Sequence, residues 1–213
     1  SYTNVRGALV LDSTSVNDAT AVANLPAAPA LSFLTNDANT SAVFLDNNGS
    51  GNNTVLNVQT ANAKALGLRP ANDPATDAGI AFNSSFSWDF DQSDGIGAGL
   101  NDFVGVSVHE IGHALGFTSG VDTVDATHGA GPSAPIDLNG FRGFRVLDLY
   151  RYTAAGQLDQ ATGGAPYFSL DGGTTNLALF STGAFNGDGR QASHWKDNLG
   201  IGLMDPTANP PGN

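Results

Sequence analysis

The chain has 213 residues, enough for one domain with its own hydrophobic core. Its 8 Lys and Arg residues against 20 Asp and Glu residues give a formal net charge of −12, which disfavours nucleic acids and anionic membrane surfaces as partners. There is no cysteine, which excludes disulfides, thiolate metal ligands and a cysteine nucleophile. No apolar run is long enough to span a membrane.

The N-terminal third of the chain predicts short elements. Residues 2–11 fit a short helix or a strand, and residues 15–25 fit a helix with Ser15 as its N-cap. The Asn- and Gly-rich stretch 47–53 predicts a loop. Within residues 55–68, the Ala-rich stretch 61–68 predicts another helix that ends near Gly67.

The clearest strand signal covers residues 80–90. Apolar side chains occupy one parity and small polar ones the other, with Ser84 as the one break. One face of the strand is therefore expected to pack on a core and the other to face solvent or a ligand. The apolar set comprises Ile80, Phe82, Phe86, Trp88 and Phe90.

A helix is predicted next, starting at Asn101 or Asp102 as N-cap and running to about Leu115. Gly116 is expected to end it with a positive φ. One narrow stripe of this helix is apolar and is expected to be buried, which leaves the opposite side facing a cleft. The stripe expected to be buried comprises Val104, Val108, Ile111 and Leu115.

The C-terminal half predicts an irregular part and further short strands. Residues 144–152 fit a strand or a buried helix, and residues 165–171 and 175–180 fit strands. The tail 209–213 (NPPGN) is expected to be disordered. Helices and strands in this order indicate an α+β fold.

Residues 109–113 read His-Glu-Ile-Gly-His and carry the strongest chemical signal. On a helix, positions i and i+4 share one face, so His109 and His113 can bind one divalent ion. Glu110, the only glutamate of the chain, is then placed to act on a water at that ion. This pattern predicts a catalytic zinc site, with Glu110 as general base.

A catalytic zinc site needs a third protein ligand and one open position. In the commonest extended motif that ligand is a histidine six residues after the second one, but Ser119 stands there. The ligand must therefore come from elsewhere, and the residues alone leave these candidates open: His194, His128, Asp122 and Asp125.

The stretch HEIGHALGF, a distant Ser-His-Trp and a lone methionine in Gly-Leu-Met-Asp-Pro together resemble the leishmanolysin branch of the metzincin zinc endopeptidases. The resemblance implies that His109, His113 and His194 bind zinc. It also implies that Met204 forms a methionine turn beneath the metal. The nearest relatives look like secreted bacterial enzymes with a long insertion before the third histidine.

The resemblance also implies a two-lobed fold, with a twisted mixed sheet and the zinc helix in residues 1–116 and an irregular lobe in residues 117–213. In metzincins an edge strand above the cleft pairs with extended substrate. Carried over, that strand comprises Phe82, Asn83, Ser84 and Ser85.

Two features depart from the family pattern. Leishmanolysins are rich in cysteine, whereas this chain has none. Many metzincins carry a tyrosine two residues after the turn methionine, where this chain has Pro206. A tyrosine that donates to the transition state would therefore have to come from elsewhere.

The function expected from the sequence is a secreted bacterial zinc endopeptidase acting on peptides or proteins. The few lysines and the abundance of Gly, Asn, Ser and Thr are also typical of exported proteins. Two other interpretations remain: an exported structural or adhesion module that binds zinc without cleaving peptides, and a metal-dependent hydrolase of non-peptide amides.

The Asp-rich loop D-F-D-Q-S-D-G is a candidate site for a second metal, calcium, and a solvated turn before the next helix is the alternative. Its candidate ligands are Asp89, Asp91 and Asp94, although the EF-hand pattern is not met. Asp188 in Asn-Gly-Asp-Gly is a weaker candidate for such a site.

Overall fold

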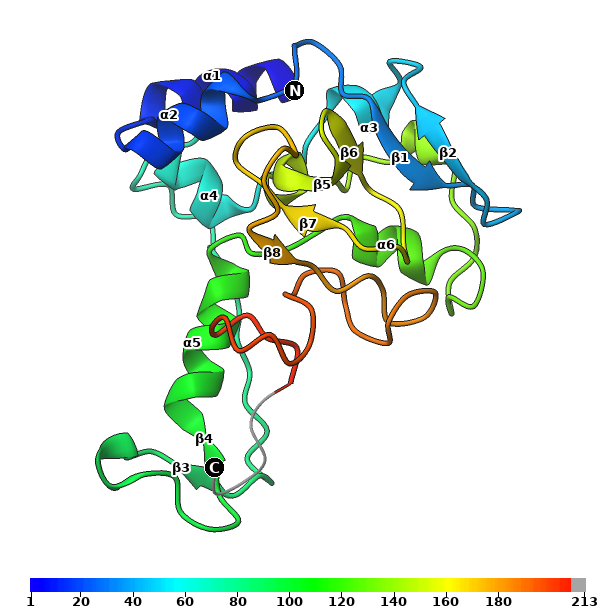
Figure 1. Ribbon diagram of the computed structural model, residues 1–213. Coiled ribbons are helices and arrows are strands. Elements are labelled where there is room, and N and C mark those ends of the chain that lie inside the picture. Colours follow the sequence, from blue (N-terminus) through cyan, green and yellow to red (C-terminus); the bar gives the residue numbers. More distant parts are fainter. Residues whose placement is uncertain (208–213) are drawn as a thin grey trace.

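The computed structural model describes residues 1–207, and the predicted disordered tail lies outside them. The fold is mixed α+β (Figure 1). The helices are α1 (Tyr2–Asp12), α2 (Val16–Ala23), α3 (Gly51–Thr54), α4 (Thr60–Ala65), α5 (Phe103–Ala114) and α6 (Val121–Ala126). The strands are β1 (Phe33–Asn36), β2 (Val43–Asp46), β3 (Trp88–Asp89), β4 (Asn101–Asp102), β5 (Arg151–Ala154), β6 (Gln157–Asp159), β7 (Tyr167–Phe168) and β8 (Ala178–Leu179).

Six strands form one mixed sheet in the order β2-β1-β6-β5-β7-β8. The β1–β6 pair is parallel, with Phe33 opposite Leu158, and the other neighbours are antiparallel. Four of the six strands therefore come from the C-terminal half. The expected confinement of the sheet to residues 1–116 is wrong, because strands from both halves of the chain pair with each other.

The core also joins the two halves of the chain. Phe33 of β1 packs edge-on against Phe144, with ring centroids 5.0 Å apart. The buried cluster further includes Tyr2 and Val5 of α1 together with Leu149 and Leu158 of the C-terminal half. The helices α1 and α2 thus pack on the sheet domain and lie away from α5 (Figure 1).

Most of the elements predicted in the N-terminal third are present in the structure. Residues 2–12 form a helix, and Ser15 caps α2 with a reciprocal bond to Asp18. The predicted loop 47–53 is wrong in its last part, because Ser50 caps the single turn α3. The helix predicted from the Ala-rich stretch 61–68 is confirmed as α4, which ends at Ala65 with Leu66 as its C-cap.

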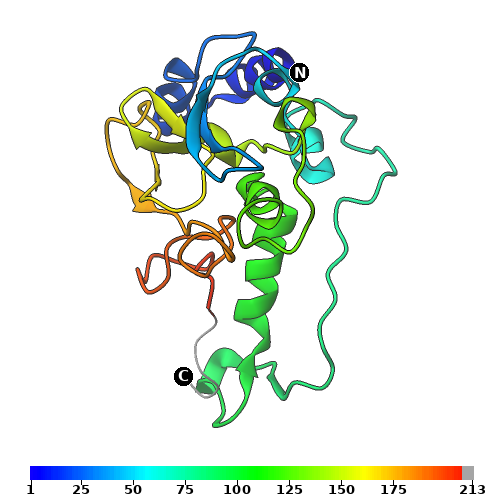
Figure 2. The same cartoon turned by 90° about the vertical axis from the view of Figure 1, so that its right-hand side faces the viewer.

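The strand predicted over residues 80–90 is largely wrong. Only Trp88 and Asp89 are paired, with the equally short β4, and the stretch Phe82–Ser85 includes no strand. The chain between α4 and β3 runs along the direction of α5 as an extended segment, apart from the helix over most of its length (Figure 2). Its aromatic side chains instead gather on Phe103, the first residue of α5; those in contact with it are Phe82, Trp88 and Phe90.

The apolar stripe of α5 is not buried, which corrects the sequence prediction. No residue of α5 is buried, and Val104, Val108, Ile111 and Leu115 are 38–61 % exposed. The pattern fails because burial needs an opposing layer. The large sheet lies beyond the C-terminal end of the helix, so it does not cover this stripe (Figures 1 and 2).

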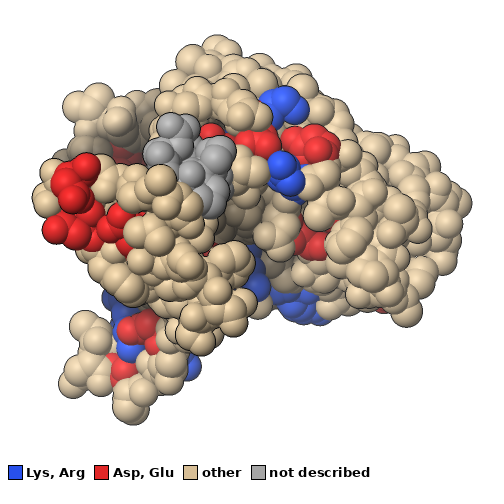
Figure 3. Space-filling model, turned by 90° about the horizontal axis from the view of Figure 1, so that it is seen from below, with Lys and Arg blue, Asp and Glu red and all other residues tan. Residues whose placement is uncertain are grey.

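No described helix combines the length and apolar character needed to cross a membrane. The face at the lower end of α5 carries acidic side chains in several separate patches, with basic side chains between some of them (Figure 3).

Candidate metal centre

The helix α5 positions the first two histidines. Asp102 caps it by accepting a hydrogen bond from the Gly105 amide at 2.9 Å, as the sequence predicts. His109 and His113 then lie one turn apart on one side of the helix. Gly116 adopts a φ of +119°, which ends the helix as expected and turns the chain toward α6.

A separate loop brings His194 to the same place. Two backbone hydrogen bonds hold it to the sheet domain: the Ser181 amide donates to the His194 carbonyl at 3.0 Å, and the Lys196 amide donates to the Leu179 carbonyl at 2.8 Å. Together they form the antiparallel bridge between Phe180 and Trp195. The Trp195 ring packs on Phe117, just after α5, with centroids 4.8 Å apart. The sheet domain and the helix thus meet at this loop.

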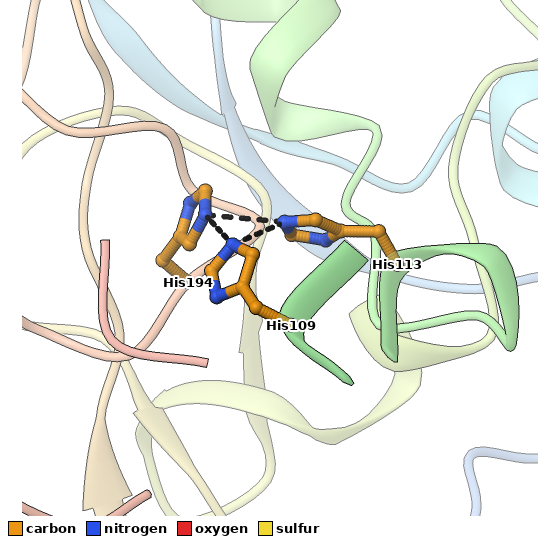
Figure 4. Close-up of side chains that lie close together, drawn as sticks. All are labelled: His109, His113 and His194. Carbon is orange, nitrogen blue, oxygen red and sulfur yellow. Dashed lines mark hydrogen bonds between the residues drawn. The ribbon is translucent and has the colours of Figure 1, made fainter. Parts of the chain in front are cut away.

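The three imidazoles converge through their Nε2 atoms (Figure 4). The Nε2–Nε2 distances are 3.1 Å between His109 and His113, 3.2 Å between His113 and His194, and 3.3 Å between His109 and His194. Among residues 1–207 this is the one group of three or more potential ligands whose ligand atoms lie within 4.8 Å of one another.

Each imidazole is oriented from behind by a backbone carbonyl. Nδ1 of His109 contacts the Leu203 carbonyl at 2.5 Å, and Nδ1 of His113 contacts the Phe117 carbonyl at 2.7 Å. Nδ1 of His194 contacts the Gln191 carbonyl at 3.2 Å. A carbonyl can only accept, so each Nδ1 carries the proton and each Nε2 presents a lone pair to the centre.

This donor set fits zinc. A tetrahedral ion with Zn–N bonds of about 2.0–2.1 Å holds its nitrogen ligands roughly 3.3–3.4 Å apart. The observed separations are close to that value. Three lone pairs at this distance would repel one another without a cation between them, so the geometry of the cluster is that of a metal-binding site.

Burial, together with the neighbouring His113 and His109, lowers the pKa of His194 to about 4 against the opposing effect of the Gln191 carbonyl. His194 is therefore neutral, as a metal ligand must be, over the whole physiological pH range.

The metal-free protein should consequently lose stability as pH falls. The unfolded chain takes up the His194 proton near pH 6.5, whereas the folded chain resists it until about pH 4. Between pH 7.5 and pH 4.5, the wild type should therefore lose up to about 3 kcal/mol more of its free energy of unfolding than His194→Asn, which has no imidazole to protonate. Denaturant unfolding of both chains with chelator present measures this. Parallel pH profiles would contradict it.

Met204 packs against α5 between the two helical histidines. A Cβ added at Gly112 would lie 2.5 Å from the Met204 sulfur, so only glycine at this helix position lets the methionine approach. The Met204 carbonyl accepts a bond from the Trp195 amide at 2.9 Å, and Leu203 before it accepts from His109. The methionine turn expected from the resemblance thus lies next to the triad.

Glu110 lies half-buried beside an open cavity of about 500 Å³ that reaches His109. Its carboxylate accepts no hydrogen bond from the part of the chain that the structure describes. The remaining walls come from the start of α5, the loop before it and the segment around Met204. They comprise Ile96, Asn101, Asp102, Gly105, Val106, Gly200, Gly202, Leu203, Asp205, Pro206 and Thr207.

The other candidates for the third ligand have different partners. His128 is buried, with Nδ1 on the Val124 carbonyl and Nε2 near the Thr162 hydroxyl. Asp125 accepts from the amides of residues 185 and 186. Asp122 binds the segment before His194 rather than the triad.

The structure does not bring the expected calcium ligands together. Within residues 1–207, Asp89, Asp91 and Asp94 do not form a cluster of convergent ligand atoms. Asp89 and Asp91 accept backbone amide bonds as turn caps instead. Asp188 accepts from the Thr182 amide and pairs with Lys196. The acidic loops are thus explained by turn formation.

Sequence reasoning missed the groups behind the triad. The Leu203, Phe117 and Gln191 carbonyls are backbone atoms, which no residue pattern reveals. It also missed that Asp122 and Ser193 form a partly buried hydrogen-bonded pair next to His194, because 71 positions separate them.

The chain matched no known protein in three searches, covering family models, curated proteins and solved structures.

Proposed function

We propose that this protein is a zinc-dependent endopeptidase. The observation that carries the proposal is the convergence of three Nε2 lone pairs, each fixed by a carbonyl on Nδ1, beside a half-buried glutamate and an open cavity. Three imidazoles leave one position of a tetrahedral ion free, and the cavity gives a substrate access to it. A purely structural zinc site closes that position and needs no neighbouring base.

The residues of the chain divide the chemistry between them. His109, His113 and His194 would hold the ion, which supplies a Lewis acid for the attacking water and the scissile carbonyl. Glu110 accepts the proton of that water and passes it to the leaving amine. Met204 supports the two helical histidines from below and does not touch substrate.

We further propose that the protein belongs with the metzincins and is secreted. The motif HEIGH, the distant third histidine and the methionine against Gly112 support the first statement. The composition, poor in lysine and rich in Gly, Asn, Ser and Thr, supports the second.

The test is digestion of a mixed peptide library by the zinc-loaded chain, with and without chelator. Cuts inside the peptides that disappear with chelator and return with added zinc are expected. Blocked peptide ends separate endopeptidase from exopeptidase action. If the folded, zinc-loaded chain makes no cut, the protein is better explained as a structural or adhesion module that binds zinc. If it cleaves only non-peptide amides, it is a metal-dependent amide hydrolase and not a peptidase.

The cavity predicts which peptides are cut. It is lined by Asp102, Glu110 and Asp205 and by no lysine or arginine. Asp102 is engaged as the helix cap, whereas Asp205 forms no ion pair with a lysine or arginine of residues 1–207. The negative charge of the cavity wall attracts a lysine or arginine of the substrate, so basic residues next to the cut should be favoured.

Asp205→Asn should therefore lower kcat/KM about tenfold for peptides with Lys or Arg next to the cut, and little for those with Gln there. Burial raises the pKa of Asp205, so the assay belongs at pH 8, where the carboxyl is ionised. Asp94→Asn, in an exposed loop, is the matched control. An equal loss of kcat/KM for basic and neutral peptides would contradict a preference of the pocket for positive charge.

A further inference from the structure

A partly buried chain of hydrogen bonds lies directly behind His194. The Ser193 hydroxyl donates to Oδ2 of Asp122 in α6, and Oδ1 of Asp122 accepts from the Ala192 amide at 2.6 Å. Ala192 is fully buried and Ser193 is 6 % exposed. One carboxylate therefore holds both residues that precede His194.

The same hydroxyl reaches the other side of the site. Ser193 Oγ accepts a hydrogen bond from the Ser119 amide at 2.8 Å. Ser119 lies two residues after Phe117, whose carbonyl orients His113. Ser119 in turn donates to the buried carboxylate of Asp148 at 2.5 Å. A single side chain thus links the segment that leaves α5 with the segment that carries His194.

Placing the Asp122 carboxylate here costs free energy, because the surrounding protein removes it from water. Burial raises its pKa, although the bonds from Ser193 and Ala192 and the charge of Arg151 oppose that rise. A buried carboxyl is tolerated when its acceptor sites are filled in a fixed geometry. That geometry constrains residues 192 and 193, and through them the direction of the next side chain.

We propose that Asp122 and Ser193 are positioning residues for the metal centre, which set the His194 Nε2 atom 3.2–3.3 Å from those of His113 and His109. Neither residue touches metal or substrate. The inference rests on the proposed function only in requiring that the triad binds zinc, and it holds whether or not peptides are cut.

The chain offers a matched control. Ser169, in the loop after β7, is fully buried, donates to Asp171 at 2.7 Å and accepts from the Gly173 amide at 3.0 Å. Ser169→Ala and Ser193→Ala therefore each remove a serine hydroxyl that donates to an aspartate and accepts from a backbone amide. Only the second of these arrangements adjoins a histidine of the triad.

The test compares zinc affinity and the cobalt(II) absorption spectrum of the full chain and both variants, with the melting temperature of each metal-free protein measured alongside. Ser193→Ala should bind zinc about 10–100-fold more weakly and change the cobalt d–d bands, as for other groups that orient metal ligands. Ser169→Ala should lower only the melting temperature. Ser193→Thr, which keeps the hydroxyl, should restore the affinity.

Wild-type affinity and an unchanged cobalt spectrum in Ser193→Ala would overturn the proposal and leave the zinc site standing. A wild-type chain that binds no zinc would overturn both. Should Ser193→Ala not fold, Asp122→Asn tests the same point. It keeps an acceptor for the Ala192 amide but loses the carboxylate, and weaker zinc binding with an altered cobalt spectrum is again expected. Unchanged binding would again reject the proposal.

Discussion

Glu110→Gln should lower kcat on a cleavable peptide by about 10²–10⁴-fold while the chain keeps its full zinc content. The amide has nearly the shape of the carboxylate but cannot accept a proton from water. Glu110 accepts no hydrogen bond from the described residues, so the exchange leaves the fold without a lost partner. Steady-state kinetics and metal analysis of the same preparation measure both quantities.

Asp94→Asn serves as the control for this exchange, because it converts an exposed carboxylate to an amide away from the triad. It should leave kcat unchanged. Near-normal activity in Glu110→Gln would remove Glu110 from the proposed chemistry. A parallel loss of zinc would show that its role is to support the metal.

His194→Ala should weaken zinc binding by more than about 100-fold. Loss of a group that only orients a metal ligand costs up to about that much, and loss of the ligand itself should cost more. The imidazole supplies one of three ligands, and no other described histidine or carboxylate lies in the cluster to replace it. Competition with a chromophoric chelator measures the affinity.

His128→Ala is the matched control for this variant. His128 is equally buried, and both of its ring nitrogens have partners away from the triad. The control should lose stability and keep its zinc affinity. Equal affinities in His194→Ala and the wild type would show that the third ligand is another residue.

The parts of the site that could be predicted from the sequence are local. The 109–113 spacing, the Asp102 cap and the positive φ at Gly116 all depend on residues within a few turns of one another. Helical periodicity then fixes which side chains share a face. The third histidine was found through a family resemblance, and the residues alone left His128, Asp122 and Asp125 open.

The larger architecture depends on contacts distant in sequence. The strand β1 pairs with β6, more than 100 residues later, and neither strand exceeds four residues. Such short segments carry little alternation, so nothing in the sequence indicates their partners.

Two strong periodic patterns misled for one physical reason. The alternation in residues 80–90 and the apolar stripe of α5 both predict burial, but a pattern states only what a segment could bury. In the described structure no sheet covers either one. The aromatic residues of the first pattern pack on Phe103 instead.

The most direct test of the central claim is the rate of peptide cleavage as zinc is added to the metal-free chain. The proposal predicts that activity rises from zero to a plateau at one equivalent of zinc. The plateau should be absent in Glu110→Gln at the same zinc occupancy. A chain that binds one equivalent of zinc, remains folded and cleaves no peptide at any zinc level would contradict the assignment as a metallopeptidase.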